Sequence, residues 1–404
     1  MPRIPNPNPY TLVNSIENDI RFLSQELEDR QSQTDQEQQA AQYITDRLKA
    51  LLPTARRVDF DAVGNFRLMF AAYCGEFILV GLVALWWPTV AFFYGLTIFL
   101  AYMAEFIGYP VFSRFLPHYE SSSAVGLLEA HDASCFLVFT AYLDTDDNPF
   151  ARVEAMLARF QLHYVVIACM VLVLATCGID ALGAYYGQAS ADTWWMRLLG
   201  VGALASFSVA GFVRALATWQ NRGANNNASG LAALLHVAER LNANPIPNTS
   251  ALFYAAGSHH ANMAGMRTML TENPAMTENT YLVNIEGVGA GQLCYTRAEG
   301  ILHQMPCAPE LVAVAEQLGK AHQASPTTIH NRRTNAYLPL MRGVHAMSVT
   351  RLGEDGLPVH FGSDADVFNH VDSEAVLKAA VFAELVAREA AKRHLAIDGF
   401  NDNG

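Results

Sequence analysis

Four long apolar runs in two adjacent pairs constrain the fold of this 404-residue chain more than any other feature. The first pair spans Leu68 to Tyr109, and Trp86-Trp87-Pro88 divides it into two segments of about 20 residues, the length that crosses a bilayer. The second pair comprises His163 to Leu182 and Met196 to Trp219, joined by a polar loop. We therefore predict two transmembrane hairpins. The alternative is that the runs are buried helices of a large soluble protein.

The composition agrees with a membrane protein. Hydrophobic residues make up 51% of the chain and charged residues only 16%, against about 25% charged in an ordinary soluble domain. The net charge of −12 argues against a nucleic-acid binder that works through a basic surface. The six cysteines fall singly, without a CxxC motif, and predict reduced thiols in the core or facing the bilayer.

Basic residues near the ends of the apolar runs predict the orientation. The opposite turns offer only Arg197, whereas the side shared by the termini carries Arg56, Arg57, Arg67, Arg114, Arg152, Arg159, Arg214 and Arg222. By the positive-inside tendency, we expect a multi-pass protein of an inner or plasma membrane, with the soluble part and both termini cytoplasmic. Met1 to Tyr10 lacks the basic start and apolar stretch of a cleavable signal, so none is expected.

Polar and small residues inside the runs raise separate questions. Glu76 and Glu105 interrupt the first hairpin, and a carboxylate at membrane depth costs a few kcal/mol unless it is interfacial or paired. We expect structural or interfacial placement of these two glutamates, with a contact to a partner helix or a proton relay as alternatives.

Small residues in the last apolar run permit close helix packing, which we expect against the neighbouring helices of the same chain. They are Gly200, Gly202, Ala203, Ala205, Ser206, Ser208, Ala210 and Gly211.

The chain outside the apolar runs predicts a single α/β domain. Leu12 to Leu52 is polar with a helical period, and its expected inward residues are Leu23, Leu27, Ile44 and Leu48. Ala124 to Leu128 and Cys135 to Ala141 are predicted strands, separated by His131-Asp132 and so expected to form a hairpin.

Strands and helices alternate after the second apolar pair. The predicted strands are Ala251 to Ala256, Tyr281 to Ile285 and His345 to Arg351, and the predicted helices are Ala228 to Leu241, Glu310 to His322 and Ser373 to Lys392. This alternation indicates an α/β sandwich with a mixed sheet. We divide the chain into domain parts 1–66, 113–160 and 220–404, interrupted by the hairpins at 67–112 and 161–219.

Five short motifs with polar or small residues follow one another along the chain. They are Phe139 to Thr145, Gly223 to Gly230, Ala255 to Gly265 around Ser258-His259-His260, Asn284 to Gly289, and His360 with Asp364, Asp366 and Val371-Asp372. Their order and spacing resemble those of the di-zinc aminopeptidases and glutamate carboxypeptidases of peptidase family M28. The resemblance implies a Zn-exopeptidase-like α/β/α sandwich with a mixed sheet. The two hairpins predicted from the apolar runs, four transmembrane helices in all, would be inserted into it.

The same resemblance implies that most of the metal site has been replaced. In the family, two zinc ions share a bridging carboxylate, and a separate Glu is the general base. The positions carried over are Tyr142 for a ligand His, Asn226 for the bridging Asp, His259 for the general base, His260 for a ligand carboxylate, and Glu286 and His360, which keep ligand character. Asp144 matches the Asp that orients the ligand His from behind.

Charge argues against a pair of zinc ions at these positions. Two nearby dications repel each other, and neutral Asn226 lacks the negative charge of the bridging carboxylate. Tyr142 could bind a metal only as a phenolate, whose ordinary pKa is about 10. The sequence thus assigns no catalytic residue, and we expect Asp144 to accept hydrogen bonds from the backbone or a neighbouring side chain.

Two arrangements of the remaining groups stay open. His260, His360 and Asn226, with Glu286 across from them, could hold one Zn²⁺ or another divalent ion. Alternatively, the two histidines hydrogen-bond each other, Tyr142 and Asn226 in a filled pocket.

The resulting prediction is a membrane-embedded pseudoenzyme. We expect a scaffold or accessory subunit of a membrane protein complex, in contact with the lipid bilayer and an integral membrane partner, and without nucleic acid or a cofactor. The alternative is an enzyme: a single-metal-dependent peptidase or amidohydrolase at the cytoplasmic membrane surface.

Overall fold

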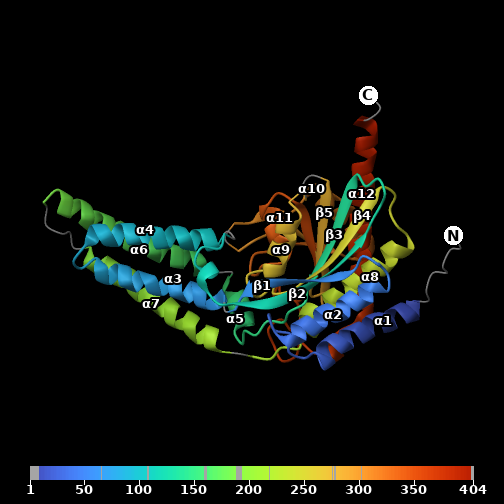
Figure 1. Ribbon diagram of the computed structural model, residues 1–404, viewed down its shortest axis with the longest axis horizontal. Coiled ribbons are helices and arrows are strands. Elements are labelled where there is room, and N and C mark those ends of the chain that lie inside the picture. Colours follow the sequence, from blue (N-terminus) through green and yellow to red (C-terminus); the bar gives the residue numbers. More distant parts are fainter. Residues whose placement is uncertain are drawn as a thin grey trace.

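The computed structural model has two parts, a bundle of apolar helices and an α/β body from which the bundle projects (Figure 1). It describes residues 9–64, 66–106, 109–158, 162–187, 193–217, 219–274, 276, 279–301 and 303–401. The bundle contains α3 (Phe66–Val83), α4 (Pro88–Phe106), α6 (Leu162–Tyr185) and α7 (Trp194–Leu216).

The body contains the remaining elements. Its helices are α1 (Pro9–Arg21), α2 (Asp35–Lys49), α5 (Ala151–Ala158), α8 (Ser229–Ala243), α9 (Ala264–Glu272), α10 (Pro309–His322), α11 (Tyr337–Met341) and α12 (Ser373–Asn401). Short helical turns are η1 (Phe22–Glu26), η2 (Ser113–Phe115), η3 (Ala224–Ala228) and η4 (Phe368–His370). The strands are β1 (Arg56–Val63), β2 (His118–Leu128), β3 (Cys135–Tyr142), β4 (Thr249–Ala256), β5 (Thr280–Ile285), β6 (Gln292–Glu299), β7 (Met305–Pro306), β8 (Ser325–Ile329) and β9 (His345–Leu352).

These strands form one nine-stranded sheet, which is mixed as the sequence predicts, although β1, β6, β7 and β8 were not predicted. The order is β1-β2-β4-β3-β5-β9-β6-β7, with β8 beside β6. The central strands β4, β3, β5 and β9 are parallel, so their carboxyl ends meet at one edge. Such an edge is where open α/β sheets carry their sites.

The predicted hairpin of β2 and β3 is wrong. Strand β4 lies between them, antiparallel to β2 and parallel to β3, with Leu252 opposite both Leu127 and Val138. All eight residues of β4 are buried. A strand that is buried on both faces is most stable at the centre of a sheet. The turn signal near His131 carries no information about a strand more than a hundred residues away.

Helices cover both faces of the sheet. Helices α8 and α12 pack against the central strands, and α1 and α2 lie beside them (Figure 1). The predicted inward residues Leu23, Leu27, Ile44 and Leu48 are all buried in this layer. Helices α9 and α11 lie together on the opposite side (Figure 1).

Three helices of the bundle are long and apolar enough to cross a membrane, over Pro88–Glu105, Leu162–Tyr185 and Trp194–Leu216. The fourth apolar helix is shorter over the residues searched, Leu68–Val83, so the prediction of four transmembrane helices is not confirmed. Large apolar side chains cover the outside of the bundle, such as Trp86 at 67% and Leu199 at 72% exposure. A surface of this kind suits hydrocarbon better than water.

Polar groups within the bundle pair with one another. Asp180 and Arg197 form a buried ion pair between α6 and α7. The Tyr94 hydroxyl of α4 donates to Glu76 of α3, which places this carboxylate against a helix of its own hairpin. Glu105 is buried and accepts hydrogen bonds from residues just after α4, including the backbone N–H of Ser113 at 2.7 Å. The predicted structural placement of Glu105 is thereby confirmed.

Three small residues of α7, namely Gly200, Ser208 and Gly211, pack on neighbouring helices, as expected. A Cβ added at Gly200 would lie 2.8 Å from Val173 of α6, and one at Gly211 would lie 2.9 Å from Ala71 of α3. The Ser208 hydroxyl donates to the Ala71 carbonyl at 2.8 Å. Gly202 differs, because a Cβ there would meet nothing within 4 Å.

Candidate functional site

The carboxyl edge of the sheet brings most of the predicted site residues together. Tyr142 is the last residue of β3, His259 and His260 follow β4, and Glu286 follows β5. These four line one cavity. Asn226 lies in the turn before α8, where its carbonyl accepts a hydrogen bond from the Tyr142 hydroxyl at 2.8 Å.

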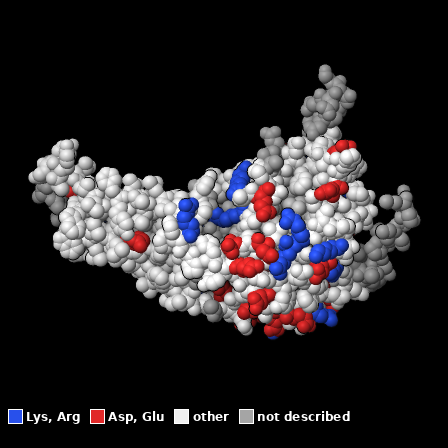
Figure 2. Space-filling model, viewed as in Figure 1, with Lys and Arg blue, Asp and Glu red and all other residues white. Residues whose placement is uncertain are grey.

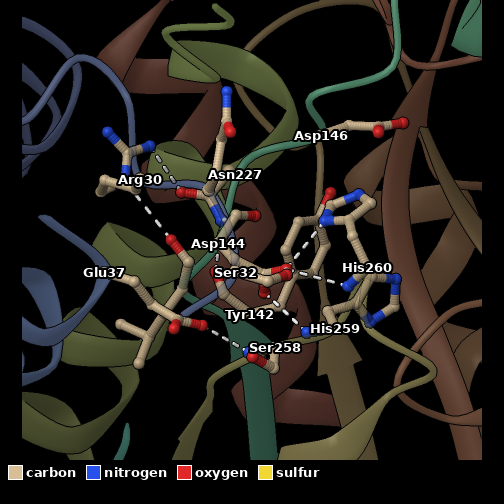
Figure 3. A network of polar contacts seen from close by, with 12 residues as sticks. Arg30, Ser32, Glu37, Tyr142, Asp144, Asp146, Asn227, Ser258, His259 and His260 are labelled. Carbon is tan, nitrogen blue, oxygen red and sulfur yellow. Dashed lines mark hydrogen bonds and ion pairs between the residues drawn. The ribbon is translucent and has the colours of Figure 1, made fainter. Parts of the chain in front are cut away.

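Asp144 is the hub of the polar network at this edge (Figure 3). Its buried carboxylate accepts hydrogen bonds from the Ser32 hydroxyl at 2.6 Å and from the backbone N–H groups of His259 at 2.7 Å and His260 at 2.8 Å. The Nδ1 atom of His260 lies 3.0 Å from the same carboxylate. Burial opposes ionisation, but the histidines and hydrogen bonds hold the pKa of Asp144 below its usual range. Asp144 therefore accepts the backbone and side-chain hydrogen bonds predicted for it.

Tyr142 is held as a neutral phenol. Its ring stacks on His259, with centroids 4.4 Å apart and planes 18° from parallel (Figure 3). Burial, and then the charge of Glu286, raises the pKa of Tyr142 well above its ordinary value. Because its hydroxyl already donates to the backbone of Asn226, the phenolate needed for a metal bond is disfavoured.

His259 and His260 have different partners. The hydrogen bond expected between His260 and His360 is not among the contacts of the described residues, since His360 lies against His370. The amide of Asn335 donates to Thr140 at 2.9 Å, so its oxygen, 2.8 Å from Nδ1 of His259, accepts the proton of that ring. Burial and the neighbouring His260 lower the pKa of His259, which keeps the ring neutral. The two rings meet edge to face at 5.0 Å, and His260 bonds Asp144 instead.

Glu286 is paired with a cation that belongs to the chain. Arg332 Nε lies 3.2 Å from Glu286 Oε1, and the Asn284 amide donates to the other carboxylate oxygen at 3.0 Å. The side chains of Arg332 and Glu286 are only 9% and 3% exposed. Arg332 lies in a loop outside the five motifs and was therefore not predicted from the sequence. The Arg332-Arg333 pair in a chain with few charges is the signal that could have indicated it.

His360 does not join the other site residues. Its ring lies against His370, with centroids 4.8 Å apart, and it is not among the residues that line the cavity. Within the described ranges, no group of three or more His, Cys, Asp or Glu side chains is arranged to hold a metal. The predicted single-metal set of His260, His360 and Glu286 is therefore not assembled there, since Asp144 holds His260 and Arg332 holds Glu286.

Two further buried ionisable groups support the loops of the site and were missed from sequence (Figure 3). The Arg30 guanidinium donates to the Leu27 carbonyl and the Asn227 side chain, both at 2.7 Å. Glu37 accepts from the backbone N–H of Ser258 at 2.5 Å, next to the two histidines. Burial, and then the charge of Asp144, raises the pKa of Glu37 to about 8. These two groups fix the loop after β4 and the turn before α8.

Comparisons with known proteins agree with this architecture. The model of peptidase family M28 matches residues 206–386. The fold is similar to BSAP, a zinc aminopeptidase from Bacillus subtilis, at 12% identity and a TM-score of 0.54, over 94% of this chain and 95% of that one. It is also similar to an aminopeptidase from Aneurinibacillus sp. strain AM-1, at 10% identity and a TM-score of 0.54, over 93% of this chain and 92% of that one.

A third similar structure is the LapA aminopeptidase of Legionella pneumophila, at 8% identity and a TM-score of 0.52, over 96% of this chain and 74% of that one. No curated protein sequence matches the chain. At these low identities the solved structures show that the fold is shared. What the site can do must be judged from the residues of this chain.

The donor set of this site does not fit a pair of zinc ions. Asn226 is neutral, Tyr142 is a hydrogen-bond donor, and Glu286 is already neutralised by Arg332. Two nearby dications need several anionic ligands to offset their repulsion. Here the Arg332 guanidinium pairs with Glu286, the carboxylate that could otherwise bind a metal.

Proposed function

Because this chain belongs to peptidase family M28, we propose that it is a membrane-embedded, catalytically inactive member that acts as a scaffold or accessory subunit of a membrane protein complex. The observation that carries the proposal is the buried ion pair of Arg332 with Glu286. A zinc ion at Glu286 would face this guanidinium at close range, and breaking a buried pair costs about 3–5 kcal/mol.

The position of the general base gives independent support. His259 occupies it, with a lowered pKa and a ring stacked on Tyr142. A neutral ring that donates one proton to Asn335 is a weak substitute for a desolvated carboxylate. The single-metal hydrolase would need His260, His360 and Glu286 around one ion, and the contacts of these residues do not favour it.

The bundle supports the proposed membrane location. Three helices of sufficient length lie beside one another, and Lys and Arg are nearly absent from the visible face of the bundle but appear where it meets the body (Figure 2). This distribution matches a body on the cytoplasmic side, next to the headgroups. The proposed scaffold role fits a body without catalysis that the apolar helices hold at the membrane.

Zinc content and aminopeptidase activity test the catalytic part. The full chain, purified in mild detergent, should hold zinc well below one ion per chain and should cleave aminoacyl p-nitroanilides no faster than a buffer control. Near-stoichiometric zinc with turnover that chelation abolishes would overturn the proposal.

A restored variant serves as the positive control. It combines Tyr142→His, Asn226→Asp, His259→Glu, His260→Glu and Glu286→Asp with Arg332→Leu, because the guanidinium must also leave. Zinc binding should return in the variant with all six changes and be weaker in the same variant that keeps Arg332. Equal zinc binding in both would show that Arg332 does not exclude the metal.

The scaffold part has its own test. Purification in mild detergent should yield a second integral membrane protein in a fixed molar ratio with this chain. A chain that purifies alone as a single species at all detergent concentrations would contradict it.

A further inference from the structure

A cavity of about 900 Å³ lies where the bundle meets the body. One part of its lining is polar and belongs to the site, with Tyr142, His260, Glu286 and Arg332. Another part is apolar and belongs to the bundle, with side chains of α3, α6 and α7. These include Phe70, Leu162, Val166, Phe207, Ala210 and Val213. The cavity is as large as pockets that enclose a small organic ligand.

Arg332 presents hydrogen-bond donors that the described part of the chain does not satisfy. Its side chain is nine-tenths buried, and its Nε donates to Glu286. The terminal nitrogens Nη1 and Nη2 are buried, and no described residue accepts a hydrogen bond from them. Leaving such donors unpaired costs more than 1 kcal/mol each, so an acceptor from outside the chain would be bound favourably.

The chemistry of that acceptor follows from the guanidinium. Nη1 and Nη2 are parallel donors, which match the two oxygens of a carboxylate or a phosphate. The other charges in the lining are balanced: Arg214 pairs with Glu154 at 2.6 Å, and Arg333 and Asp146 contribute one charge of each sign. Recognition of an anion would therefore depend on hydrogen bonds from Arg332 more than on a net positive field.

The apolar part of the cavity indicates what the anion is attached to. Its walls come from α6 and α7, two helices that could cross a membrane, and from α3 beside them. A small water-soluble anion would leave these walls in contact with water, whereas a hydrocarbon chain would cover them. An acidic peptide would bring backbone groups that the apolar walls cannot satisfy.

We propose that this cavity binds one anionic amphiphile from the surrounding bilayer. Its carboxylate or phosphate head lies on Arg332, and its hydrocarbon chain lies between α3, α6 and α7. The proposal concerns ligand binding and does not depend on the loss of catalysis, so zinc or turnover in the protein would not decide it.

Binding is measured by native mass spectrometry of the full chain in mild detergent. Oleate, phosphatidylglycerol and phosphatidylcholine are titrated separately, and inorganic phosphate and an acidic hexapeptide are added as competitors. One oleate or phosphatidylglycerol should bind at least about ten-fold more tightly than phosphatidylcholine. The difference in affinity between oleate and phosphatidylglycerol identifies the preferred head group. Neither phosphate nor the hexapeptide should displace these ligands at equal concentration.

Variants separate the two parts of the cavity. Arg332→Gln combined with Glu286→Gln removes both charges together, so no buried charge is left unpaired, and it should weaken oleate or phosphatidylglycerol binding about ten-fold or more. Ala210→Trp fills the apolar part and should do the same with Arg332 intact. Val209→Trp is the matched control, because Val209 is exposed on the same helix and does not line the cavity.

Several results would overturn the proposal. They are the absence of a one-to-one complex with oleate or phosphatidylglycerol, binding that is equal for phosphatidylcholine, and displacement by phosphate or the hexapeptide. Unchanged binding in Ala210→Trp would also overturn it, even where the double variant fails to fold.

Discussion

At the scale of single residues, neighbours decide what each polar group of the site can do. Asp144 satisfies donors from two loops, and His260 binds it through Nδ1. Tyr142 gives its proton to a backbone carbonyl, and Glu286 neutralises Arg332. The four groups are thus occupied by contacts within the chain, which gives each of them a structural value.

Replacing Asp144 with Asn tests this structural value. Asp144→Asn keeps the shape but removes the charge that the buried donors share, and it should lower the free energy of unfolding by about 2–4 kcal/mol. The measurement is the thermal unfolding midpoint in detergent. Asp132→Asn, at an exposed position, is the matched control and should leave the midpoint nearly unchanged. Equal midpoints for the two variants would contradict the role of Asp144.

Glu37 predicts a pH dependence of stability. Its pKa of about 8 in the folded chain exceeds the ordinary value of 4.5, so the folded state keeps a proton that the unfolded state has lost. Stability should therefore fall as the pH rises between about 4.5 and about 8. Glu37→Gln mimics the protonated form and should flatten this fall, whereas Glu120→Gln at an exposed position should not. Parallel pH profiles of the unfolding midpoint in all three proteins would contradict the assignment.

At the scale of elements, the same periodic patterns that predict helices and strands leave their pairing open. The strand predictions for β2, β3, β4, β5 and β9 are confirmed, yet β4 separates β2 from β3. In the bundle, the sequence predicts which segments are apolar, and the structure adds the buried pair of Asp180 in α6 with Arg197 in α7. Pairing across elements depends on contacts between residues far apart in the chain.

The Asp180–Arg197 pair predicts a non-additive pair of substitutions. Arg197→Ala leaves a buried carboxylate without its cation and should destabilise the bundle by about 3–5 kcal/mol. Adding Asp180→Asn should recover part of this loss, since the uncompensated charge is then gone. Thermal unfolding of the single and double variants in detergent measures the difference. A double variant that is less stable than Arg197→Ala would argue against a paired charge.

At the scale of the whole molecule, the bundle and the body divide apolar and charged surface between them. The bundle exposes large apolar side chains, and charged residues crowd the face of the body that Figure 2 shows. The cavity lies at the junction of the two parts, where a lipid and the polar site can meet. We expect this junction to lie at the level of the headgroups.

Cysteine labelling tests the proposed orientation. Tyr186→Cys lies just beyond the end of α6 that is remote from the body, and Asp132→Cys lies in the body; both positions are exposed. In intact cells, a membrane-impermeant maleimide should label Tyr186→Cys and should reach Asp132→Cys only after permeabilisation. The native cysteine of intermediate exposure, Cys169, is replaced by Ala in both variants. The opposite labelling pattern would place the body outside the cytoplasm.

The sequence by itself determined the apolar runs, most strands and helices, the mixed sheet and the order of the five motifs, because periodicity and local residue type carry that information. It also indicated Tyr142, His259, His260 and Glu286 as neighbours. Only the tertiary structure decided that β4 separates β2 from β3, that Arg332 neutralises Glu286, and that His360 lies against His370. These outcomes depend on which buried charges find partners across distant segments, and no local pattern encodes such a choice.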